Sequence, residues 1–115
     1  MSARFLFVSG ADSFLNRMKL FFNWKKEIAF ERCRSLDETL MAVDGHSPQV
    51  LFLEHSLTPF GSEGIEVVNA LRERRSCVRT VLLISDPDVA DYYRALEIPV
   101  ITKPEFLSFY QIIGS

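Results

Sequence analysis

Three side chains that could take part in phosphoryl or proton transfer each directly follow a short, mainly apolar run. They are Glu54, Ser85 and Lys103. A carboxylate, a hydroxyl and an ammonium gathered at one point could serve acid–base or phosphoryl chemistry. The carboxylate and the ammonium could equally form a structural ion pair. Either outcome requires a fold that brings the three groups together.

The runs before these side chains are expected to be strands of one parallel sheet. Gln49–Leu53 contains four consecutive apolar residues, which indicates a strand buried on both faces. Similar runs predict strands at Arg4–Val8, Ile28–Cys33, Arg79–Ile84 and Val100–Thr102, and helical spacing of apolar residues follows each. Right-handed crossovers then give a three-layer α/β sandwich with a five-stranded parallel sheet in the order 2-1-3-4-5 and helices on both faces.

Such a sheet brings the ends of strands 1, 3, 4 and 5 to one edge. We therefore expect one cleft there, formed by Ser9, Gly10, Glu54, Ser85 and Lys103.

Other residues predict where helices begin, end and bury their side chains. Ser35 and Glu38 match a capping box at the start of the second helix, and Gly45 with Pro48 is expected to end it. Asp86 and Pro87 are expected to begin the fourth helix. Tyr92 and Leu96 are expected to face inward at least in part.

The composition predicts a single domain, residues 1–115, in the cytoplasm. A net charge of −2 and a pI near 5.7 offer no basic surface, so direct binding to nucleic acid or to an anionic membrane is not expected. The first apolar run is too short for a signal peptide. Cys33 and Cys77 lack the spacing of a metal-binding or redox motif and are interpreted as reduced packing residues. His46 and His55 are interpreted as solvated.

Across nearly its whole length the chain resembles the receiver domain of bacterial two-component response regulators, the CheY-like, flavodoxin-like fold. In that family a carboxylate pair after strand 1 holds Mg²⁺, and an aspartate that ends strand 3 accepts a phosphoryl group. A Thr or Ser ends strand 4, and Lys-Pro follows strand 5. By this resemblance Ser85 takes the hydroxyl position, and Lys103 and Pro104 take the positions of the lysine and the proline.

Two departures from the family pattern lie at the reaction centre. Ser9 and Gly10 stand where the resemblance places the acidic pair, so most of the charge that would retain Mg²⁺ is lost and no metal or other cofactor is expected. Asp12 is interpreted as the cap of helix 1, with a replacement metal ligand as the alternative. Glu54 stands where the aspartate would, one methylene longer, which displaces any acyl phosphate from Ser85 and Lys103. Phosphorylation of Glu54 is therefore not expected.

Glu54 is instead predicted to pair directly with Lys103 and to fix one conformation without phosphate. The alternative is a solvated glutamate with no signalling role. By resemblance the output face comprises helix 4, strand 5 and helix 5, where Val100 replaces an aromatic switch residue and Phe106, Phe109 and Tyr110 could be left exposed. The loop after Glu54 is longer than usual for the family. Two interpretations remain for the extra residues, a tolerated insertion or a contact with a partner.

Three function classes remain. The leading hypothesis is a degenerate (pseudo-)receiver of a bacterial two-component-type pathway, which is not an enzyme and acts by phosphorylation-independent binding to a signalling protein or output domain. A homodimer through the output face is a further expectation. The first alternative is a phospho-accepting receiver with an unconventional acidic site at Glu54 or Asp12. The second is a small flavodoxin-like ligand-binding domain, which Ser9-Gly10-Ala11-Asp12 supports weakly because it offers one glycine only.

Overall fold

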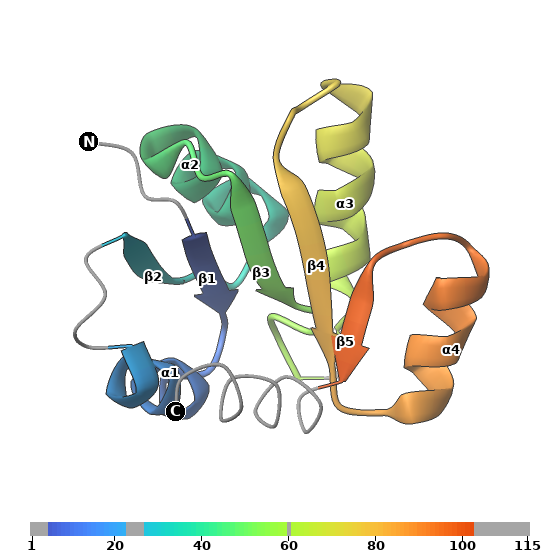
Figure 1. Ribbon diagram of the computed structural model, residues 1–115, viewed down its shortest axis with the longest axis horizontal. Helices are drawn as coiled ribbons and strands as arrows, with labels where there is room; N and C mark the ends of the chain where they lie inside the picture. The colour runs from blue at the N-terminus through green and yellow to red at the C-terminus, as the bar shows by residue number, and fades with distance from the viewer. Residues whose placement is uncertain (1–4, 23–26, 60, 103–115) are drawn as a thin grey trace.

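The computed structural model describes residues 5–22, 27–59 and 61–102, with side chains 21 and 22 excepted, and shows strands and helices in strict alternation (Figure 1). The strands are β1 (Phe5–Ser9), β2 (Ile28–Arg32), β3 (Val50–Glu54), β4 (Arg79–Ile84) and β5 (Val100–Thr102). The helices are α1 (Asp12–Phe22), α2 (Leu36–His46), α3 (Glu63–Glu73) and α4 (Pro87–Ala95). None of these helices has the length and apolar character needed to cross a bilayer.

All strand pairs are parallel, and the sheet has the order β2-β1-β3-β4-β5, which confirms the predicted topology. Successive residues of the central strands point to opposite faces. Leu6, Leu51 and Leu82 belong to one core cluster, together with residues of α2, α3 and α4. Phe7 and Leu83 belong to a second cluster, together with Leu15 and Met18 of α1. Both faces are therefore covered, with α1 opposite α2 and α3 (Figure 1).

The register of the strands sets which residues meet at the carboxyl edge of the sheet. Val8 of β1 lies beside Leu53 of β3, and Glu54 lies beside Leu83 of β4. The residue after Val8 is Ser9, which ends β1 and is completely buried. Ser9 and Glu54 therefore end neighbouring strands, as the parallel order requires.

The predicted start of α2 is confirmed, and the helix ends before Pro48 as predicted, but the role predicted for Gly45 is wrong. Ser35 caps the helix and accepts a hydrogen bond from the Glu38 backbone N–H, while the Glu38 carboxylate accepts one from the backbone N–H of Arg34. The helix passes through Gly45 and ends at His46. Ser47 takes the left-handed conformation at φ 47° and donates its backbone N–H to the carbonyl of Val43. A glycine ends a helix only where it takes this conformation, and at this helix end Ser47 does so instead.

The start of α4 matches the prediction, because the Asp86 side chain accepts from the Asp88 N–H and Pro87 is the first helical residue. The predicted inward face of α4 is wrong for Tyr92 and Leu96, which are 63% and 52% exposed. Ala90 and Ile98 are buried in their place. Because α4 packs on β4 and the edge strand β5, it has a narrower area to cover than a helix over the sheet centre.

Candidate functional site

Glu54 and Ser9 contact each other directly at the carboxyl edge of the sheet. The Ser9 hydroxyl donates a hydrogen bond to Oε1 of Glu54, and Ser9 Oγ accepts one from the backbone N–H of Ala11 at 3.0 Å. Glu54 is 7% exposed and Ser9 is fully buried. A buried carboxylate requires polar partners to offset its desolvation, and Ser9 is one of them. By the resemblance drawn from the sequence, the residue at an acidic-pair position thus contacts the residue at the phosphoacceptor position.

Gly10 lies against the backbone of the loop between β3 and α3. A Cβ atom at this position would lie 1.8 Å from the carbonyl oxygen and 2.7 Å from the carbonyl carbon of Leu57. Leu57 is 3% exposed and belongs to the larger core cluster. Since backbone atoms cannot rotate away, no side chain fits at Gly10 unless the loop moves. This part of the loop thus packs inward.

Glu63, the first residue of α3, holds this loop in place. Its carboxylate accepts hydrogen bonds from the Leu57 backbone N–H, at 3.1 Å, and from the Thr58 hydroxyl. The Thr58 hydroxyl is the main reason that the pKa of Glu63 lies below its usual value of 4.5, because it stabilises the ionised form. The position of Leu57 over Gly10 is therefore fixed by hydrogen bonds to the Glu63 carboxylate as well as by burial.

The residues present do not fit the Mg²⁺ site that the family would have at this edge. Asp12 is the first residue of α1 rather than its cap, is exposed, and pairs with Arg32 at 3.1 Å. Within the described ranges no three His, Cys, Asp or Glu side chains lie close enough to hold a metal ion. A hydroxyl and a glycine in place of two carboxylates supply too little negative charge for a hard divalent cation.

A pocket of about 330 Å³ lies beside this cluster. Its lining comprises Glu54, His55, Ser56, Gly61, Leu83, Ile84, Ser85, Asp86 and Val89. The structure thus brings Glu54 and Ser85 to one pocket, as predicted, and Ser85 itself is exposed. Lys103 and Pro104 lie outside the described residues, and so do Phe106, Phe109 and Tyr110. The Glu54–Lys103 pair stays a prediction.

His55, the residue after Glu54, is not simply solvated as the sequence predicted. Its Nε2 lies 3.0 Å from the hydroxyl of Tyr93 on α4, and the two ring centroids are 5.2 Å apart. Burial lowers the pKa of His55 below its usual 6.5, and the charge of Glu63 opposes that shift. His46 is likewise not simply solvated, since its Nε2 lies 2.9 Å from Oε1 of Glu31. Neither contact carries a sequence signal, because each joins residues from separate elements.

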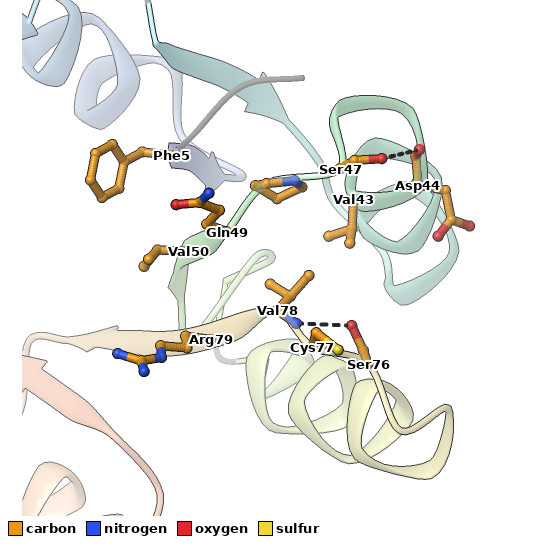
Figure 2. A pocket seen from close by; sticks show the side chains of 11 residues that line it. Phe5, Val43, Asp44, Ser47, Gln49, Val50, Ser76, Cys77, Val78 and Arg79 are labelled. Carbon is orange, nitrogen blue, oxygen red and sulfur yellow. Dashed lines mark hydrogen bonds between the residues drawn. The ribbon is translucent and has the colours of Figure 1, made fainter. Parts of the chain in front are cut away.

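A larger pocket, of about 680 Å³, lies at the opposite, amino edge of the sheet (Figure 2). It is lined by the start of β1, β3 and β4 and by the end of α2. Cys77 is among its residues and is exposed, so its prediction as a packing residue is wrong. Cys33 is buried as predicted, and burial raises the pKa of its thiol to about 11. The pocket shares no lining residue with the Glu54 site.

No protein-family model and no curated protein sequence matches the chain. Solved structures of receiver domains do match it. One is the signal receiver domain of a DNA-binding response regulator from Colwellia psychrerythraea, with 13% identity over 98% of this chain and 96% of that one and a TM-score of 0.71. A receiver protein from Pseudoalteromonas atlantica gives 18% identity over 96% of each chain and a TM-score of 0.70.

A two-component transcriptional regulator from Clostridium phytofermentans is 25% identical over 90% of this chain and 81% of that one, with a TM-score of 0.63. These structures agree with the observed strand order. The chain therefore has the CheY-like fold of response-regulator receiver domains.

Proposed function

We propose that this domain is an atypical (pseudo-)receiver of a bacterial two-component-type signalling protein, which acts in the cytoplasm by phosphorylation-independent protein–protein interaction. It is not an enzyme in this proposal, and it requires neither Mg²⁺ nor another cofactor. The supporting observation is the close packing of Ser9, Gly10, Glu54 and Leu57, here called the closed site, beside the pocket of about 330 Å³ at the carboxyl edge of the sheet. Ser9 binds Glu54, and the Leu57 carbonyl occupies the space that a side chain at position 10 would need.

Phosphoryl transfer in this fold would need a metal to neutralise charge and an acceptor held in line with the donor. The Ser9 hydroxyl occupies one oxygen of Glu54, and Gly10 offers no ligand. A phosphoryl group on Glu54 would also have to break the contact with Ser9 in a buried site. These features favour a carboxylate with a structural role over a phosphoacceptor.

The exposed side of α4 supports the interaction role. Tyr92 lies on α4 and Leu96 is the residue that caps its carboxyl end, and both are more than half exposed. Tyrosine is enriched at the centres of protein interfaces. Val100, on the neighbouring edge strand, is half-buried against the core and contributes less. The proposed partner is a signalling protein or an output domain, and a homodimer through the same face is a further expectation that light scattering tests.

The decisive experiment is thermal unfolding with and without Mg²⁺ and beryllofluoride, a mimic of the phosphoryl group. A ligand at a hundred times its dissociation constant would stabilise a working receiver by about 2.7 kcal/mol, or roughly 10 °C in Tm for a domain of this size. We expect a change of less than about 1 °C. Glu54→Gln is the matched control. A rise in Tm that disappears in Glu54→Gln would establish the phospho-accepting alternative and overturn the proposal.

A further inference from the structure

A directed chain of hydrogen bonds runs from α4 into the loop beside Glu54. Ser56 Oγ lies 2.6 Å from the Gly61 carbonyl oxygen and 3.3 Å from Nδ1 of His55. A serine hydroxyl has one proton, and the short contact to a carbonyl, which can only accept, takes that proton. Ser56 can then only accept from the imidazole, so Nδ1 of His55 carries the proton.

The proton on Nδ1 also determines the protonation state of the second ring nitrogen, Nε2. In a neutral imidazole with a proton on Nδ1, Nε2 has the free lone pair. Nε2 must therefore accept the hydrogen bond from the Tyr93 hydroxyl, at 3.0 Å. The neutral form agrees with the burial of His55, which lowers its pKa despite the opposing charge of Glu63 on α3. The chain of donors thus runs from Tyr93 to His55, to Ser56 and to the backbone at Gly61.

The two ends of this series of hydrogen bonds lie in the two parts of the molecule on which the proposed function depends. One end lies in the loop that also contains Leu57, which covers Gly10. The other end lies on α4, where Tyr92 is in ring contact with Tyr93 at a centroid distance of 5.4 Å. Tyr93 is half-buried, whereas Tyr92 is exposed. His55 thus connects the loop that contains Leu57 to the helix that carries the exposed Tyr92.

We infer that His55 is a positioning residue, which ties α4 to the loop over the closed site, so that a fixed hydrogen bond rather than a phosphate sets the orientation of the exposed α4 surface. The inference rests on the proposed function in taking α4 as the interaction surface. The link itself is defined by geometry within this chain alone.

A double-mutant cycle measures the link. His55→Ala and Tyr93→Phe, alone and together, are compared by urea unfolding, with Tyr92→Phe as the matched control on the adjacent tyrosine. One net hydrogen bond of about 1 kcal/mol corresponds to a coupling of about fivefold in the unfolding equilibrium constant. We expect that coupling for Tyr93 and additive effects, within about twofold, for Tyr92. Additive effects for both tyrosines would overturn the link.

Two further measurements separate a positioning role from a merely stabilising one and do not need the His55→Ala variant to fold. Nitrogen-15 NMR of the wild-type imidazole at neutral pH should show the proton on Nδ1, and a proton on Nε2 would refute the assignment. Amide hydrogen exchange along α4 should quicken about fivefold in Tyr93→Phe and stay unchanged in Tyr92→Phe. Equal exchange in the two variants would overturn the positioning role.

These measurements use no metal and no beryllofluoride, so they can fail or succeed separately from the test of the proposed function. A domain that responds to beryllofluoride but shows the coupling would retain the link and lose the pseudo-receiver assignment. A domain that ignores beryllofluoride but shows no coupling would lose the link alone.

Discussion

Replacing Gly10 with alanine should destabilise the domain by about 2 kcal/mol. The added methyl group would lie 1.8 Å from the Leu57 carbonyl oxygen and 3.2 Å from Leu57 Cα, so the loop backbone must shift. A local shift costs about 1–3 kcal/mol, typical of an overpacked core. Complete expulsion of the Leu57 side chain, now 3% exposed, would add the loss of a buried leucine, about 1.5–3 kcal/mol. We expect a partial shift, because Glu63 still holds the loop through Thr58.

Urea unfolding followed by circular dichroism measures this change. With a slope of about 1.5 kcal/mol per M, the midpoint should fall by roughly 1.3 M. Gly45→Ala is the matched control, because a Cβ at Gly45 has no atom within 4 Å and the residue lies inside α2. That variant should gain about 0.5–1 kcal/mol from the better helix propensity of alanine. A Gly10→Ala protein as stable as the wild type would refute the closed site and reopen the question of a metal ligand at this position.

The remaining predictions concern the cysteines and the pH dependence of stability. Cys77 should react with a thiol reagent in the folded protein, whereas Cys33, buried and with a pKa of about 11, should react only on unfolding. Because the folded-state pKa of His55 is lowered, its contribution to stability is complete above pH 6.5 and should fall as the pH drops through that lowered pKa, as urea midpoints between pH 5 and 8 would reveal. Glu63 should add a second loss below pH 4.5, which Glu63→Gln abolishes.

The strand order and the edge position of Glu54 could be predicted because they depend on patterns that are local in the sequence. Short apolar runs specify the strands, which are three to six residues long, and their alternation with helices leaves few topologies once crossovers are right-handed. Helix starts were equally readable at Ser35 and Asp86, since a capping side chain bonds to a backbone N–H two or three residues away. The role of Gly45 was misread, because a glycine could end a helix but Gly45 takes a helical conformation here.

The sequence alone determined the fold and the chemical identity of the residues at the sheet edge: a glutamate, a serine and a glycine, at positions where the resemblance to receiver domains places three carboxylates. Only the tertiary structure decided what these residues do to one another. The bond between Ser9 and Glu54 spans 45 positions, and the Leu57 carbonyl reaches Gly10 from a different loop. The link between His55 and Tyr93 spans 38 positions. Such contacts depend on sheet register and loop path, which are properties of the folded chain, so no pattern of neighbouring residues records them.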